Sequence, residues 1–259
     1  MKLRAVIACI SLAAAACFVF TAAASADTIG DLKLTSAGTV NISLSSLAFT
    51  ADPSSTPPGP PWNAEVNAGT SLKFAGCASG TLGTAGCLSA TEAVQMTSPL
   101  SFTSGAISSF VTFSANSSLV YSLSGIAGGS STTNCATVTL GNGCSPIAGS
   151  PLIFSDTATG TSVLLSFTGQ AKDGTNPTNY MGLITIPFAG LTPEQVLTML
   201  CPSGTCTSAD VTAGRTISGS FTADLVSTAA PSVPEPGTLV LFGSGLLGVA
   251  GALRRKLAS

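Results

Sequence analysis

The 259-residue chain contains no histidine. Ser-His-Asp and Cys-His nucleophile activation both need an imidazole, as do histidine-ligated metal sites, so these chemistries are excluded. A Ser-Lys dyad is not indicated either, because none of the lysines between the two chain ends stands in an S-x-x-K setting. The sequence therefore argues against the commonest hydrolytic mechanisms that use a serine or cysteine nucleophile.

Paired carboxylates are the remaining route to glycoside hydrolysis, since a glycosidase needs two acids close together in a cleft. Glu65 with Glu92, or Asp156 with Asp173, could supply such a pair. Nothing in their sequence surroundings favours that role over solvated loop acids. We expect no catalytic residues, no metal, no cofactor and no enzymatic activity, with a hydrolase as an alternative that turnover would reveal.

Charge is scarce, at 8% of residues, and it is unevenly distributed along the chain. Residues 27–236 hold four cations and eleven anions, a side-chain charge of −7, while the other five cations lie in the two end segments. Such a surface repels phosphate backbones, so nucleic acid is not an expected partner.

The first 26 residues have the organisation of a secretory signal peptide. Lys2 and Arg4 precede an apolar run, and the small residues Ala24 and Ala26 predict signal cleavage before Asp27. An alternative is lipoprotein processing at Cys17, which the continuing apolar run after that residue disfavours.

The last residues combine three chemically different pieces in a fixed order. Pro234, Glu235 and Pro236 form a stiff, extended acidic tripeptide, because proline fixes its own φ and disfavours helix at the preceding residue. An uncharged run of roughly 24 Å in helical form follows, and then a cationic membrane stop of Arg254, Arg255 and Lys256.

This tail resembles the PEP-CTERM sorting signal of Gram-negative exported proteins. The resemblance implies an exosortase-type membrane processing enzyme as partner, removal of the tail near the motif, transient anchoring in the inner membrane, and delivery to the cell surface or an exopolysaccharide matrix. A plain tail anchor that stays in the membrane is the alternative. The resemblance covers about a tenth of the chain and leaves the role of the remainder open.

Between the two ends, short segments rich in Val, Ile, Thr and Phe alternate with small polar residues and predict strands. The predicted strands include 40–44, 107–113, 119–123, 163–167, 183–186 and 216–226. We predict an all-β fold, a two-sheet, jelly-roll-like β-sandwich. One short helix is expected at 191–200, with Thr192 as N-cap, Pro193 in the first turn, and an apolar stripe of Val196, Met199 and Leu200.

The predicted organisation has four parts: a signal peptide (1–26), an all-β exported domain (27–228), a linker with the PEP motif (229–236), and a C-terminal transmembrane sorting helix with its basic tail (237–259). A proline-rich segment at 52–62 is expected to be a loop or spacer. The loop at 172–179 could offer oxygen ligands to calcium through Asp173, Asn176 and Asn179, although a turn is favoured.

Six cysteines remain after signal removal, an even number that predicts disulfides in an exported chain. Fifteen connectivities are possible. The simplest joins neighbours in sequence: Cys77 with Cys87, Cys135 with Cys144, and Cys201 with Cys206.

The sequence therefore predicts an exported surface or extracellular-matrix protein with a structural or adhesive role. The alternative is a carbohydrate-binding module that acts in the exopolysaccharide matrix. In that case the single tryptophan, Trp62, or one of the two tyrosines, Tyr121 and Tyr180, would stack on sugar rings.

Overall fold

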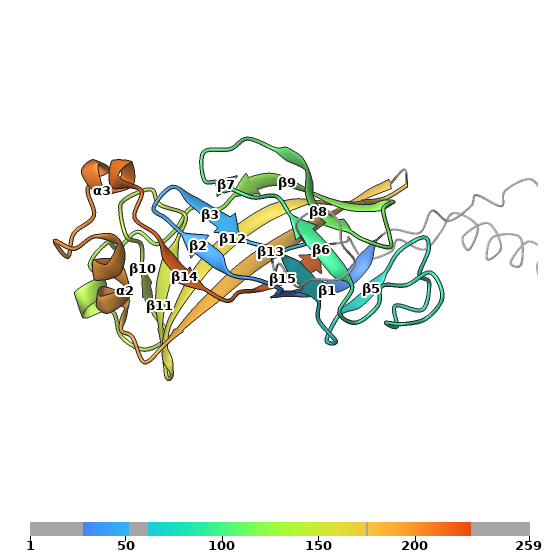
Figure 1. Ribbon diagram of the computed structural model, residues 1–259, viewed down its shortest axis with the longest axis horizontal. Coiled ribbons are helices and arrows are strands. Elements are labelled where there is room, and N and C mark those ends of the chain that lie inside the picture. The colour runs from blue at the N-terminus through green and yellow to red at the C-terminus, as the bar shows by residue number, and fades with distance from the viewer. Residues whose placement is uncertain (1–27, 52–61, 175, 229–259) are drawn as a thin grey trace, which may run out of the picture. The chain divides into compact units, whose positions relative to one another are not determined.

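The computed structural model describes residues 28–51, 62–174 and 176–228 (Figure 1). These described residues belong to one compact unit. The predicted signal peptide, most of the proline-rich segment, the PEP tripeptide and the transmembrane sorting helix with its cationic stop lie outside the described residues. Within the described ranges, none of the helices has the length and apolar character that crossing a membrane requires.

The described residues are mostly β-structure, which confirms the predicted fold class. The strands are β1 (Ile29–Ser36), β2 (Val40–Ile42), β3 (Ser46–Phe49), β4 (Ala64–Val66), β5 (Ser71–Lys73), β6 (Ala93–Met96), β7 (Leu100–Ser101), β8 (Ile107–Phe113), β9 (Leu119–Ile126), β10 (Gly143–Cys144), β11 (Ile153–Thr157), β12 (Gly160–Asp173), β13 (Asn176–Ala189), β14 (Ile217–Gly219) and β15 (Thr222–Ser227). The helices are the 3₁₀-helix η1 (Cys135–Thr137), α2 (Pro193–Leu200) and α3 (Ser208–Ala213).

The larger sheet differs from the predicted sandwich because it closes on itself. One edge of β12 pairs with β13, and the other pairs with β11 along its first half and with β9 along its second half. The resulting ring has eight strands in the order β12-β13-β15-β1-β4-β6-β8-β9, with β10 and β11 extending from β12 and β5 pairing with β1. Closure is possible because the 14-residue β12 is long enough to hold a different neighbour on each half of one edge.

The barrel interior is filled by alternate residues of its strands, as expected for a closed sheet of eight strands. Along β12 every second residue from Thr161 to Asp173 is buried. Five aromatic rings form a continuous set of edge-on or tilted contacts with centroids 5.1–6.1 Å apart: Phe110, Phe113, Tyr121, Phe167 and Tyr180.

The second sheet is small and has the order β14-β2-β3-β7. The sequence predicted one long strand over 216–226, and this prediction was wrong. The segment instead divides into β14, in the small sheet, and β15, in the barrel. Phe221 lies between them, is buried, and packs edge-on against Phe49 of β3 at 5.0 Å. The chain therefore passes from the small sheet to the barrel at a buried residue.

The helix predicted at 191–200 is confirmed as α2. Thr192 Oγ1 accepts a hydrogen bond from the Gln195 amide, and Gln195 Oε1 accepts one from the Thr192 amide, which completes a capping box. The predicted apolar stripe was partly wrong: Met199 is exposed, and Leu197 is buried beside Val196 and Leu200. The sequence analysis also missed α3, although Asp210 caps it through Thr207 and Gly214 ends it in the left-handed region at φ 60°.

The unit has two distinct ends (Figure 1). At the attachment end, β1 begins beside the last residues of β15, because Asp31 pairs with Val226. At the distal end lie α2, α3, η1, β10 and the β11–β12 turn, since β12 runs from Gly160 at this end to Asp173 at the other.

Candidate functional site

Both flanking segments of the chain join the unit at the attachment end. The Gly30 amide donates a hydrogen bond to Ser227 Oγ (2.9 Å), so the first and last described strands are joined where they meet the rest of the chain. The Thr228 amide donates to the Asn179 carbonyl (2.8 Å) on β13. The segment that precedes β1 and the segment that follows β15 therefore connect to the same end of the barrel.

Three disulfides join the cysteines that are nearest in sequence, in agreement with the predicted pairing. Cys77–Cys87 has a Cα separation of 4.5 Å, Cys135–Cys144 one of 5.3 Å and Cys201–Cys206 one of 5.1 Å. The first closes a loop near the attachment end, where the Ala75 amide donates to Asp173 at the end of β12. The other two bonds lie at the distal end (Figure 1).

An open groove of about 590 Å³ lies beside the Cys135–Cys144 bond. We call it the distal groove; its lining residues are Ser130, Thr132, Asn134, Thr137, Val138, Thr139, Gly141, Asn142, Gly143 and Ile153. All of these side chains are uncharged. Hydroxyl and amide groups predominate, and Val138 and Ile153 supply the larger apolar side chains.

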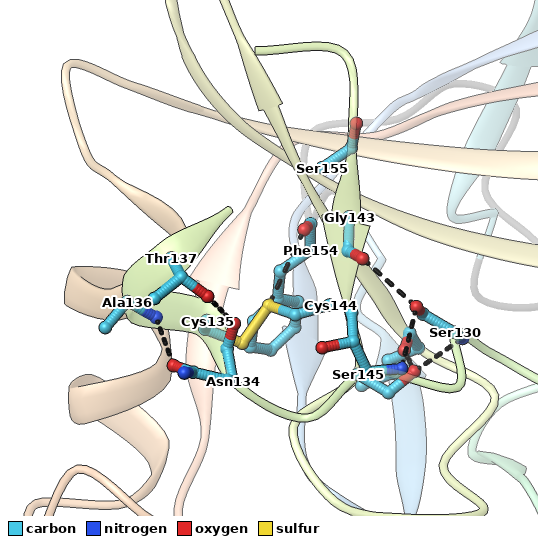
Figure 2. The surroundings of a disulfide bond; sticks show 12 residues. Ser130, Asn134, Cys135, Ala136, Thr137, Gly143, Cys144, Ser145, Phe154 and Ser155 are labelled. Carbon is cyan, nitrogen blue, oxygen red and sulfur yellow. Dashed lines mark hydrogen bonds between the residues drawn. A yellow bond between two sulfur atoms is a disulfide. The ribbon is translucent and has the colours of Figure 1, made fainter. Parts of the chain in front are cut away.

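The walls of the distal groove are held by hydrogen bonds that Figure 2 shows. Ser130 Oγ donates to the Gly143 carbonyl (3.1 Å), and the Ser130 amide donates to the buried Ser145 Oγ (2.7 Å). Ser145 Oγ in turn donates to the Leu152 carbonyl (2.8 Å). On the other side of the disulfide, Asn134 Oδ1 accepts from the Ala136 amide and caps η1.

A smaller cavity of about 220 Å³ adjoins the distal groove, and Asn134 lines both. Its wall comes from η1, from α2 through Glu194 and Leu197, and from the Cys201–Cys206 loop through Gly204 and Thr205. Glu194 is the one ionisable side chain among its lining residues. A single carboxylate does not provide the acid–base pair that glycoside hydrolysis requires.

None of the four acids of the two predicted carboxylate pairs lines the distal groove or the smaller cavity. Glu65 of β4 lies opposite Ala93 of β6, the residue after Glu92. Asp156 pairs with Thr161 near the start of β12, and Asp173 ends that strand, so about 40 Å of extended chain separates them. Glu92 is buried and accepts hydrogen bonds from the backbone amides of Ser89 and Ala115. Its carboxylate holds two turns together.

In the predicted calcium loop, β12 and β13 pair as far as Asp173 and Asn176, in agreement with the favoured turn. The Asp173 carboxylate accepts from the Ala75 amide, and Asn179 Oδ1 accepts from Gln170 Nε2 (3.1 Å). These two oxygens serve different partners, and the side chain of Asn176, the third predicted ligand, lies outside the described residues. Among the described residues, no group of three or more Cys, Asp or Glu side chains is placed to hold a metal ion.

The three aromatic residues of the carbohydrate-binding interpretation do not form a surface platform. Tyr121 is 1% exposed, Tyr180 2% and Trp62 8%. Burial raises the pKa of both tyrosines above the ordinary range, and the Tyr180 phenol adds to the increase for Tyr121. Because these rings belong to the core, that interpretation needs other residues.

The sequence analysis missed the distal groove because none of its residue types indicates a site alone. The available signal was composition: Cys135 and Cys144 enclose Thr, Asn and Gly residues, and Ser130 and Thr132 come just before them. A disulfide that encloses small polar residues indicates a fixed loop. The position of Ile153 in the groove wall could not be predicted, because it depends on strand pairing.

The comparisons with known proteins identify the C-terminal segment. Residues 232–256 match the family model described as PEP-CTERM protein-sorting motif. No curated protein and no solved structure matches the chain. This match includes the Pro234–Glu235–Pro236 tripeptide and the Arg254–Lys256 cations, the residues on which the resemblance depended. The chain therefore carries a PEP-CTERM sorting motif, which marks an exported protein that an exosortase, a membrane enzyme, processes.

Proposed function

We propose that the mature protein is a non-enzymatic structural or adhesive component of the cell surface or the extracellular matrix. In this proposal residues 1–26 are removed as a signal peptide, and residues 237–259 anchor the chain in the inner membrane until an exosortase acts near Pro234–Pro236. The folded unit is then the part that remains at its destination.

One observation carries the proposal: both flanking segments join the unit at the attachment end. The hydrogen bond from the Gly30 amide to Ser227 Oγ keeps these two connections together. The distal end, with two of the three disulfides and the distal groove, is the part of the barrel farthest from both connections. This arrangement supports a domain that makes its contacts through the distal end.

The role without catalysis is supported by the chemistry of the described residues. Asp156 and Asp173 lie at opposite ends of β12, the Glu92 carboxylate is engaged by two backbone amides, and the smaller distal cavity is lined by a single ionisable group, Glu194. The disulfides fix loops in a chain with few charges, as suits a secreted domain outside a reducing compartment.

The proposal is tested by the intact mass of the protein recovered from the host cell surface and medium. The wild-type protein should begin at Asp27, end near Pro236 and contain three disulfides. The triple variant Pro234→Ala/Glu235→Ala/Pro236→Ala should remain in the membrane fraction with Arg254–Lys256 attached.

A matched control is Pro231→Ala, which changes a proline just outside the matched segment and should be processed like wild type. Recovery of wild-type protein that retains its C-terminal residues would contradict tail removal. Hydrolysis of polysaccharide by the purified mature protein would contradict the non-enzymatic role.

A further inference from the structure

We propose that the distal groove binds a neutral glycan segment. This inference rests on the proposed function, because it names the class of partner that a surface or matrix protein would hold. The groove differs in every residue from the aromatic platform that the sequence analysis considered, since Trp62, Tyr121 and Tyr180 are buried.

The charge of the groove and of its surroundings selects a neutral ligand. All ten lining side chains are uncharged. Residues 27–236 carry a net side-chain charge of −7, so an anionic polymer would approach against a repulsive field. A cationic ligand would find no carboxylate among the groove's lining residues with which to pair.

The lining groups match the hydrogen-bonding pattern of a sugar. Together they can donate and accept: the Thr132 and Thr139 hydroxyls have a proton to donate, the Ser130 and Thr137 hydroxyls, which donate to the Gly143 and Asn134 carbonyls, can accept, and the side-chain amides of Asn134 and Asn142 can do both. Sugar hydroxyls need this dual capacity. Val138 and Ile153 provide apolar contact for the C–H faces of a pyranose ring.

The groove is also preorganised, which lowers the entropy lost when a ligand binds. The Cys135–Cys144 bond joins η1, on one wall, to β10, on the other. The hydrogen bond from Ser130 Oγ to the Gly143 carbonyl ties the segment before η1 to β10 on the other side of the disulfide (Figure 2). Two lining segments of the groove are therefore tied to β10, one by a covalent bond and one by a hydrogen bond.

A peptide fits this site less well than a glycan. Extended peptides bind by adding a strand to a sheet edge, and the edge here is β10, which has two residues. Small apolar ligands need enclosed apolar pockets, whereas this groove is open and mostly polar. An open polar groove suits one stretch of a longer hydroxyl-rich chain.

The test uses mature protein purified from its own host and a printed array of neutral and acidic glycans. Titration then follows with soluble dextran, galactomannan and alginate, and with a Ser/Thr-rich peptide. We expect saturable binding to at least one neutral glycan. Thr132→Phe, which fills the groove, and the double variant Cys135→Ser/Cys144→Ser should each weaken that binding at least tenfold.

Two matched variants separate the groove from general stability. Cys77→Ser/Cys87→Ser removes a disulfide near the attachment end, and Thr168→Val removes an exposed hydroxyl on β12 outside the groove. Both should bind like wild type. Absence of neutral glycan binding, binding of alginate or the peptide alone, or unchanged binding by Thr132→Phe would overturn the proposal. In each of these cases, a Thr132→Phe protein with the mature mass at the cell surface or in the medium would show that the proposed sorting and processing still hold.

Discussion

Gly169 of β12 lies directly opposite Tyr180 of β13, and the Tyr180 ring occupies the space that a side chain at Gly169 would need. A Cβ at this position would lie 2.6 Å from Tyr180 Oη and would also collide with the Ser122 carbonyl oxygen. The tyrosine hydroxyl donates to that same carbonyl (3.0 Å). Glycine lets the ring cover the strand backbone, as in other curved sheets where an aromatic residue covers a glycine.

We predict that Gly169→Ala lowers the free energy of unfolding by about 3 kcal/mol, because the new methyl group must displace a buried ring or the β9 backbone. Chemical denaturation measures the change. Gly125→Ala on β9 is the matched control, since a Cβ there would meet nothing within 4 Å, and it should change stability by less than about 1 kcal/mol. Equal effects of the two substitutions would contradict the packing described.

The buried tyrosines predict a loss of stability in alkali. Their pKa values are raised in the folded state by burial, so the folded protein keeps two protons that the unfolded chain releases near pH 10. This contribution is complete below pH 10 and is lost as the pH rises, at about 1.4 kcal/mol per pH unit for each tyrosine. Tyr180→Phe should halve that slope.

The chain has only these two tyrosines, so phenolate absorbance reports on them alone. We expect the absorbance to appear together with unfolding, as followed by circular dichroism. Phenolate that appears near pH 10 while the protein remains folded would show that the rings are accessible.

Glu92→Gln should destabilise the protein by about 2 kcal/mol. Oε2 accepts the Ser89 amide and Oε1 accepts the Ala115 amide, each at 3.1 Å, so a glutamine must turn its NH₂ group toward one of these donors. Glu65→Gln on β4 is the control and should have little effect. Thermal denaturation of both variants and of the wild-type protein measures these changes. Equal stability of the two variants would contradict the role given to the Glu92 carboxylate.

Thr91 precedes this carboxylate and has a φ of 64°, in the left-handed region that β-branched residues rarely adopt. Thr91→Gly should stabilise the protein by about 1 kcal/mol, because glycine removes the clash of Cβ with the backbone at the cost of some unfolded-state entropy. Denaturant titration measures this. A destabilised variant would mean that the Thr91 side chain contributes more than its strained backbone costs.

Local signals made α2 predictable and left the barrel undetected. The helix boundary depends on Thr192, Pro193 and Gln195, which interact within one turn. Closure of the barrel depends on β12 pairing with both β9 and β11, and alternation along a strand does not say which strand lies beside it. Inward-facing residues alternate with outward-facing ones along a strand in both a sandwich and a barrel, so the alternation does not distinguish the two folds.

Aromatic residues were ambiguous for a similar reason. Tyr121 and Tyr180 have side chains that suit either a sugar platform or a core with a polar partner, and sequence alone does not count the neighbours that bury them. The disulfides were predictable because each pair is close in sequence. The distal groove was not, because its wall includes Ile153, which strand pairing brings beside Gly143.

The place of β15 in the ring has a consequence for the order in which the protein folds. This last strand lies between β13 and β1 and pairs with both, so the barrel has a gap until residues 222–227 arrive. A chain that crosses a membrane from its N-terminus cannot complete the barrel before that strand has crossed, and the sorting motif follows it within a few residues. In the proposed export, the strand that closes the seam is therefore followed directly by the processing signal.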